Sequence, residues 1–165
     1  SGDVGMEPVR DLQLAYGLAV AACLGIAALR DLTERRIPNA VPAALLILYP
    51  GVFALGLGPA PWWGGLAVGF AVFAAAAALF AGNILGGGDA KLLGAVALWA
   101  GPAWVLEALL VTALLGGVAA VARLLRPIFL TPVLGPQPGA RATSLPYGVA
   151  IAGGGLWVAG RMAGL

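Results

Sequence analysis

The 165-residue sequence contains no histidine, one cysteine and, besides Ser1, a single serine, Ser144. Without histidine the chain cannot form the H-E-x-x-H zinc site of membrane metalloproteases or the Ser-His and Cys-His pairs of nucleophilic hydrolases. With Cys23 alone it can form no intrachain disulfide and no cysteine-based zinc site. Enzymatic chemistry, if the chain has any, must therefore come from carboxylates, lysines and tyrosines.

Charged residues are also scarce. They make up 10% of the chain, whereas hydrophobic residues make up 61%, and a soluble domain carries roughly 25% charged residues. Because so few charges cannot cover a globule in water, we expect membrane lipid to surround much of the chain. The nine basic residues are spread among apolar segments, and without a basic stripe we predict no nucleic-acid partner.

Long apolar runs predict the fold. A helix needs about 20 apolar residues to cross the hydrocarbon core, and these runs are continuous, which favours helices over a barrel. We predict an all-α, polytopic transmembrane helical bundle of about six helices. Residues 6–165 would form a single transmembrane domain, and residues 1–5, before Met6, are expected to be a vector-derived remnant. The predicted spans are Leu12 to Leu29, Ala40 to Leu57, Trp63 to Ala81, Ala90 to Ala100, Ala103 to Leu125 and Leu145 to Met162.

The basic residues predict how these spans are oriented, because they concentrate in cytoplasmic loops. The breaks at residues 58–61 and 101–102 carry no charge, whereas the breaks on the other side are basic. The basic side should therefore face the cytoplasm, and its residues are Arg30, Arg35, Arg36, Lys91, Arg123, Arg126 and Arg141. Tryptophans are typical of the interface, and five fall near the predicted outer ends: Trp62, Trp63, Trp99, Trp104 and Trp157.

The fourth predicted span, Ala90 to Ala100, is short for a membrane helix. It would rise only about 16 Å. Either this helix includes residues from 83–89, or the Gly-Gly-Gly-Asp turn that ends at Asp89 lies below the headgroups. In the second case Asp89 would be at membrane depth, where irregular backbone must be buried in protein or line a water-filled cavity.

Six acidic residues lie beyond the first five positions: Glu7, Asp11, Asp31, Glu34, Asp89 and Glu107. The first two precede the first span on its outer side, as solvated residues do. Glu34 lies among arginines and is typical of a solvated ion pair. Glu107 is about one turn into the fifth span, so we expect its carboxylate to extend to the interface. Asp31 and Asp89 are left, each at a helix end on the predicted cytoplasmic side.

Asp31 and Asp89 suit acid–base chemistry if they face one another. Two carboxylates that share a partly dry site do not both ionise easily, so one keeps its proton while the other takes one from water. The alternative is structural: Asp31 pairs with Arg35, and Asp89 caps the following helix. Residue type and depth leave both interpretations open.

Three short motifs surround these positions. Asp31 begins Asp-Leu-Thr-Glu-Arg-Arg-Ile-Pro-Asn, Asp89 lies in Gly-Gly-Gly-Asp-Ala-Lys, and residues 145–148 read Leu-Pro-Tyr-Gly. With these motifs the sequence resembles the type IV prepilin peptidases, which are G-x-G-D intramembrane aspartyl proteases. The resemblance implies that Asp31 and Asp89 are catalytic, without metal or cofactor. It assigns substrate binding or motif support to Gly86, Gly88, Lys91, Pro38, Asn39, Pro146, Tyr147 and Gly148.

The supporting residues also have simple structural explanations. Bare glycine backbone lets a substrate strand lie close, but it equally suits a plain interhelical turn. Pro38 fits the first turn of the second span, where its missing N–H is no loss. Lys91 matches the motif, although a cation there also serves as a topology anchor.

The resemblance also implies a substrate and a location. Classical members of this family carry an N-terminal domain with two C-x-x-C pairs, which this sequence lacks, so the chain is similar to the minimal peptidases of Tad/Flp pilus systems and no methyl transfer is expected. The implied activity is an endopeptidase of the bacterial inner membrane. It would remove the basic leader of a prepilin, just before the prepilin's hydrophobic helix, at the cytoplasmic face.

Two other classes of function fit the same residues. A small transporter could use Asp31 and Asp89 as a proton or cation relay, because intramembrane acids also serve that purpose; the absence of inverted repeats counts against it. A structural membrane subunit would need neither acid. The sequence predicts no oligomeric state.

Overall fold

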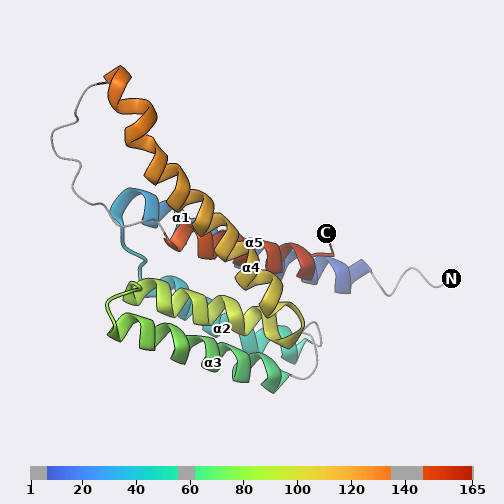
Figure 1. Ribbon diagram of the computed structural model, residues 1–165. Coiled ribbons are helices and arrows are strands. Elements are labelled where there is room, and N and C mark those ends of the chain that lie inside the picture. Colours follow the sequence, from blue (N-terminus) through green and yellow to red (C-terminus); the bar gives the residue numbers. More distant parts are fainter. Residues whose placement is uncertain (1–6, 56–61, 135–146, 165) are drawn as a thin grey trace.

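A computed structural model describes residues 7–55, 62–134 and 147–164 (Figure 1). Within these residues the chain forms five helices and no strand. The predicted all-α class is therefore confirmed, whereas the predicted number of about six helices is wrong. The helices are α1 (Glu7–Glu34), α2 (Ala40–Ala54), α3 (Trp62–Ala81), α4 (Gly87–Leu134) and α5 (Tyr147–Met162).

Helix α4 accounts for the difference in number, because it contains both the fourth and the fifth predicted spans. The chain nevertheless turns inside it, at Gly101, whose φ of 56° and ψ of −170° are not helical. Only glycine adopts this region of backbone space readily. Gly101 therefore divides α4 into a first arm that runs beside α3 and a second arm that runs beside α5 (Figure 1). The first arm starts at Gly87, so the short fourth span includes residues 87–89 in its helix.

Helix α4 is the centre of the bundle. It packs most extensively against α3 and α5, and more narrowly against α2, while α1 packs against α5 and α2. This arrangement brings the end of α1, the beginning of α4 and the beginning of α5 to the same end of the molecule (Figure 1). Those three helix ends carry the predicted motifs.

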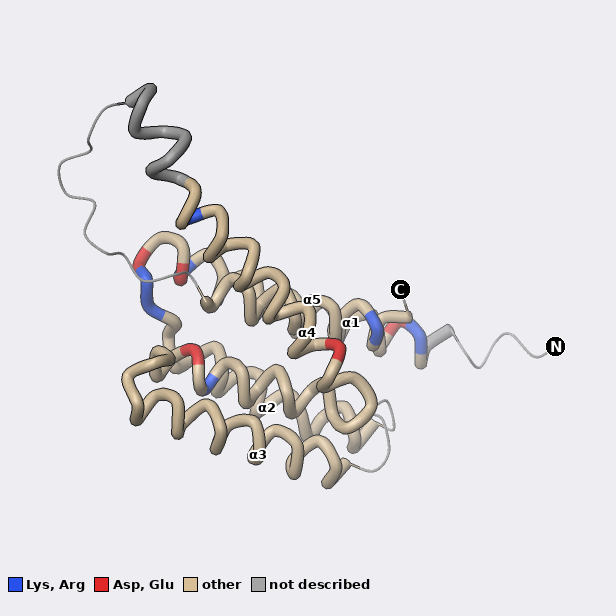
Figure 2. Tube along the Cα trace, viewed as in Figure 1, with Lys and Arg blue, Asp and Glu red and all other residues tan. Residues whose placement is uncertain are grey.

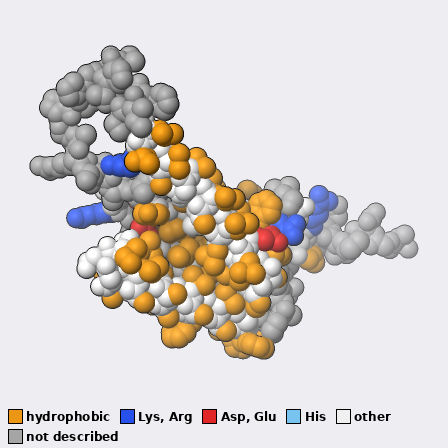
Figure 3. Space-filling model, in the orientation of Figure 1, with side chains coloured by type: hydrophobic (Ala, Val, Ile, Leu, Met, Phe, Trp, Pro, Cys, Tyr) orange, Lys and Arg blue, Asp and Glu red, His pale blue; other side chains and the backbone are white. Residues whose placement is uncertain are grey.

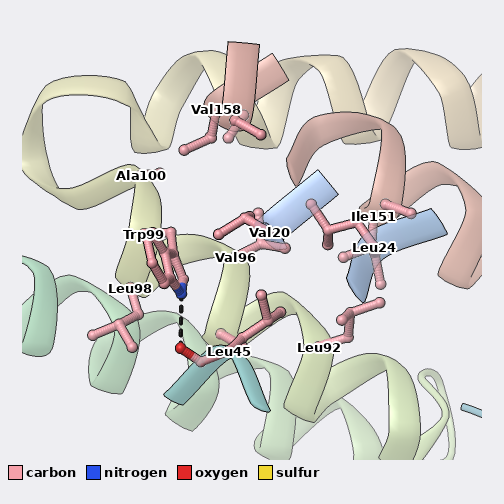
Figure 4. Close-up of a cluster of buried hydrophobic side chains, with 14 of the residues drawn as sticks. Val20, Leu24, Leu45, Leu92, Val96, Leu98, Trp99, Ala100, Ile151 and Val158 are labelled. Carbon is pink, nitrogen blue, oxygen red and sulfur yellow. Dashed lines mark hydrogen bonds between the residues drawn. The ribbon is translucent and has the colours of Figure 1, made fainter. Parts of the chain in front are cut away.

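The core lies where the first arm of α4 meets α1, α2 and α5. Its fully buried side chains include Leu24, Leu45 and Leu92 (Figure 4). Trp99 is also buried, with 3% of its surface exposed, and its indole Nε1 donates a hydrogen bond to the carbonyl oxygen of Leu45 at 2.9 Å. Trp99 is thus a core residue, and its predicted place in an interfacial belt is wrong. Trp62 and Trp63 stay exposed at the start of α3.

Three segments are long and apolar enough to cross a membrane: Val9–Glu34, Trp62–Ala81 and Gly87–Leu125. Helices α2 and α5, with 15 and 16 residues, rise only about 23 Å, which is less than a typical hydrocarbon core of about 30 Å. Hydrophobic side chains are spread over the described part of the visible face (Figure 3), and charged residues lie mainly near helix ends (Figure 2). The chain is therefore a helical membrane protein.

Candidate active site

Asp31 lies in the last turn of α1 and is almost completely buried, with 7% of its surface exposed. Its carboxylate faces the beginning of α5, where the backbone N–H of Val149 donates a hydrogen bond to Oδ2 at 3.3 Å. The first N–H groups of a helix have no partner within that helix, and the helix dipole favours an anion at this end. Helix α5 therefore supplies both a donor and a favourable field to Asp31.

Gly148 permits this approach. A Cβ atom at position 148 would lie 2.8 Å from both Cγ and Oδ2 of Asp31, and 2.8 Å from Cδ1 of Ile37. These distances are well inside van der Waals contact, so any side chain would push Asp31 or α5 out of place. The glycine of the Pro-Tyr-Gly motif thus has a definite structural reason, which is the close packing of α5 on Asp31.

Asp89 lies in the first turn of α4 and is partly buried. The preceding Gly86 lies against it, since a Cβ atom there would be 2.8 Å from Oδ2 of Asp89. An acid in the first helical turn is favoured by the helix dipole, so this position suits the predicted capping role as well as a catalytic one.

One cavity joins the two aspartates. It has a volume of about 530 Å³, and both Asp31 and Asp89 line it. The two carboxyl groups are close enough to interact electrostatically. Tyr147, Gly86 and Gly88 line the same cavity. The structure therefore brings together residues from all three motifs, which are far apart in the sequence, although their catalytic role stays a prediction.

Two residues with left-handed backbone turn the chain around this cavity. Arg35, with φ of 53°, follows α1, and its N–H donates to the carbonyl oxygen of Asp31 at 3.2 Å. Asn83, with φ of 58°, follows α3, and its N–H donates to the carbonyl oxygen of Phe80 at 2.9 Å. Asparagine tolerates this conformation better than most residues. Arg35 and Asn83 both line the cavity, so the turns that end two helices also form its walls.

A hydrogen bond connects the first two motifs directly. Lys91 Nζ donates to Oδ1 of Asn39 at 2.9 Å, which ties α4 to the beginning of α2. Gly88 packs against Ile37, because a Cβ atom at position 88 would lie 3.2 Å from Cβ of Ile37. Pro38 precedes α2, which begins at Ala40, so its predicted position in the first helical turn is wrong. Pro146 lies outside the described residues.

Glu34 and Glu107 do not line this cavity. Glu34 forms an exposed ion pair with Arg30, one helical turn earlier, in agreement with its predicted solvated pairing. Glu107 accepts a hydrogen bond from Nε1 of Trp157 at 3.1 Å. Among the described residues, no three histidine, cysteine, aspartate or glutamate side chains are grouped closely enough to hold a metal ion.

Some parts of the site have no signal in the sequence. The N–H of Val149 is a backbone donor, and any residue except proline would supply it. Asn83 and the apolar residues Phe80 and Ile84 line the cavity, yet none belongs to a predicted motif. An asparagine just after a long apolar run is the one clue that the sequence offered, since it favours a helix-ending turn.

Comparison with known proteins identifies the family. The sequence profile of the type IV leader peptidase family matches residues 18–121, which is more than half of the chain. The matched region includes both aspartates, Asn39 and Lys91, and it ends before Tyr147. Searches of curated proteins and of solved structures give no match. The chain therefore belongs to the type IV leader peptidase family, whose members are peptidases that act on prepilin-type substrates.

Proposed function

We propose that the chain is an intramembrane aspartyl endopeptidase in which Asp31 and Asp89 are the catalytic pair. The observation that carries this proposal is that both carboxyl groups line one cavity of about 530 Å³, at the end of the bundle where α1 ends and α4 and α5 begin. A cavity of this size admits water together with an extended peptide segment. Residues 6–165 would act as a single transmembrane peptidase domain, without cofactor.

The chemistry follows from two carboxyl groups that share one proton. The ionised carboxylate takes a proton from a bound water, and the resulting hydroxide attacks the carbonyl carbon of the scissile amide. The protonated carboxyl group hydrogen-bonds to the carbonyl oxygen as it becomes negative. A proton then passes to the amide nitrogen, the C–N bond breaks, and the products are a new carboxylate and a new amine.

The proposed substrate is a type IV prepilin of the Flp/Tad kind, cleaved at the end of its basic leader. Basic residues surround the proposed site: Arg35 and Arg36 line the cavity, and Arg30 lies just before Asp31. Their number at this end favours the cytoplasmic face of the inner membrane. The same cations would repel a basic leader, so recognition has to depend on contacts inside the cavity rather than on long-range attraction.

The proposal can be tested with purified protein and a prepilin in detergent. Asp31→Asn and Asp89→Asn should each reduce cleavage by at least about 10²–10⁴-fold, the usual contribution of general acid–base catalysis, while the protein stays folded. Glu34→Gln and Glu107→Gln are matched controls and should cleave normally. Near-normal cleavage by both Asn variants would contradict the aspartyl mechanism, and inhibition by a chelator would point to a metal. The alternative, a transporter that uses the two aspartates as a proton or cation relay, would be favoured by a different result. In that case the parent protein would transport protons or cations without cleaving prepilin, and both Asn variants would abolish the transport.

A further inference from the structure

A second recess lies next to the aspartate cavity. It is an apolar groove of about 470 Å³ between α2, α3 and the first arm of α4. Several of its walls are large exposed side chains, among them Leu46 with 53% of its surface exposed and Phe70 with 73%. The other apolar side chains from α2 and α3 are Pro42, Ala43, Leu66 and Phe73.

The ends of this groove differ. Helices α2 and α3 meet near one end, where the hydroxyl of Tyr49 donates a hydrogen bond to the carbonyl oxygen of Trp62 at 3.0 Å. At the other end, the bonded pair of Lys91 and Asn39 lines the groove. Lys91 follows the cavity-lining Asp89 by two residues along α4. The polar end of the groove therefore lies at the end of α4 that carries Asp89, and the Tyr49–Trp62 bond lies toward the opposite end.

Apolarity alone does not distinguish this groove. A second apolar groove, also about 470 Å³, lies along the second arm of α4 and is lined by Ala113, Leu114 and Val118, among others. None of the residues that line it belongs to a motif or to the aspartate cavity. Lipid should fill both grooves equally well, because the two are alike in size and chemistry. What distinguishes the first groove is that two motif residues, Lys91 and Asn39, line it, and that Lys91 lies two residues after Asp89 in α4.

We infer that the groove lined by Leu46 and Phe70 binds the apolar helix of the substrate, immediately after the scissile bond. This inference rests on the proposed function. A prepilin cleaved just before its hydrophobic helix must keep that helix in an apolar environment while its leader occupies the aspartate cavity. The groove offers that environment next to Asp89. Burial of apolar surface in a preformed groove also orients the peptide, and orientation contributes to catalysis.

Photocrosslinking can test this placement. The photoreactive residue p-benzoylphenylalanine is introduced at Leu46, at Phe70, or at Leu114 as a control, in an Asp89→Asn background and with a full-length Flp-type prepilin in lipid vesicles. Leu46 and Leu114 make a matched pair, because both are exposed leucines in apolar grooves of about 470 Å³. Adducts should form from Leu46 and Phe70, should map to the prepilin helix just after the leader, and should be absent from Leu114. Adducts with lipid alone, or equal prepilin adducts from all three sites, would overturn the inference.

A steric block gives a second, kinetic readout. Ala43 and Ala113 are exposed alanines, one in each groove. Ala43→Trp should raise the KM for prepilin on the order of tenfold, which corresponds to about 1.4 kcal/mol of binding, whereas Ala113→Trp should leave it unchanged. An equal effect of the two substitutions would contradict the inference.

The two proposals fail in different ways. Groove adducts with a prepilin that the parent protein never cleaves would overturn the peptidase proposal and leave the binding groove in place. Cleavage by the parent protein without groove adducts would overturn the groove alone.

Discussion

Gly148 lies directly against Asp31. A methyl group on Gly148 would come within 2.8 Å of both the carboxylate carbon and Oδ2 of Asp31. The next N–H along the chain, that of Val149, donates to the same carboxylate. The first turn of α5 therefore packs directly on the last turn of α1. The position of Asp31 depends on Gly148, which lies 117 positions later in the sequence, and on the hydrogen bond from Val149, which lies 118 positions later.

Gly148→Ala should reduce prepilin cleavage strongly. The added methyl group must displace Asp31, Ile37 or α5, and a misplacement of about 1 Å at a catalytic group can cost about 10²-fold in rate. The matched control is Gly160→Ala on the same helix, where an added Cβ meets nothing within 4 Å. Cleavage rates and thermal unfolding of both variants should be compared. Normal cleavage by Gly148→Ala would show that this close packing is dispensable.

Lys91→Met and Asn39→Leu should act through one interaction. Each change removes the hydrogen bond between Nζ of Lys91 and Oδ1 of Asn39, which we expect to lower the free energy of unfolding by about 0.5–1.5 kcal/mol. The double variant should then lose clearly less than the sum of the two single losses. Thermal or denaturant unfolding in detergent measures all three variants. Strict additivity would mean that the bond contributes nothing to stability.

Gly101→Ala should destabilise the protein by about 1–3 kcal/mol, because its φ of 56° and ψ of −170° are costly for a residue with a side chain. Gly117→Ala, in the second arm of the same helix, is the control. Its Cβ meets nothing within 4 Å, so alanine there should be neutral or stabilising by up to about 1 kcal/mol. Unfolding temperatures measured side by side decide the point. If Gly101→Ala were as stable as the parent protein, α4 would not need the non-helical backbone angles at position 101.

The proposed orientation can be checked by cysteine labelling in a Cys23→Ala background. Glu34 is the last residue of α1 and lies one turn after Asp31. Trp62 begins α3, whose opposite end carries Phe80 and lines the aspartate cavity, so Trp62 lies at the other end of the bundle. A membrane-impermeant maleimide should label Trp62→Cys in intact cells, and Glu34→Cys only after the inner membrane is permeabilised. The reverse pattern would place the aspartates outside the cytoplasm.

Local patterns in the sequence predicted much of the fold, and they predicted which two acids form the candidate catalytic pair. Continuous apolar runs predicted an all-α membrane protein, because lipid leaves the backbone few other ways to pair its polar groups. The absence of histidine reduced the possible chemistry to carboxylates. The Ile-Pro-Asn and Gly-Gly-Gly-Asp motifs pointed to Asp31 and Asp89 and to the type IV prepilin peptidases. The family match over residues 18–121 agrees with that resemblance.

Composition and hydropathy could not predict how the helices pack. Trp99 looked like an interfacial residue because it ends an apolar run, yet it is buried and bonded to Leu45, since the first arm of α4 lies in the centre of the bundle. Gly101 was predicted as a break between two spans, and its non-helical backbone angles agree with a break there. The direction in which the second arm of α4 leaves this turn, toward α5, is decided by the tertiary structure.

The sequence alone therefore determined that the protein lies in membrane lipid, that it is helical, and that two carboxyl groups are available for chemistry. Each of these depends on residue type or on spacing within about 20 positions. The tertiary structure alone decided that Asp31 and Asp89 share one cavity, that Lys91 bonds to Asn39 and that Val149 donates to Asp31. These contacts join residues 52 to 118 positions apart. The contact between α5 and Asp31 requires a glycine at position 148, because a side chain there would collide with the carboxylate of Asp31.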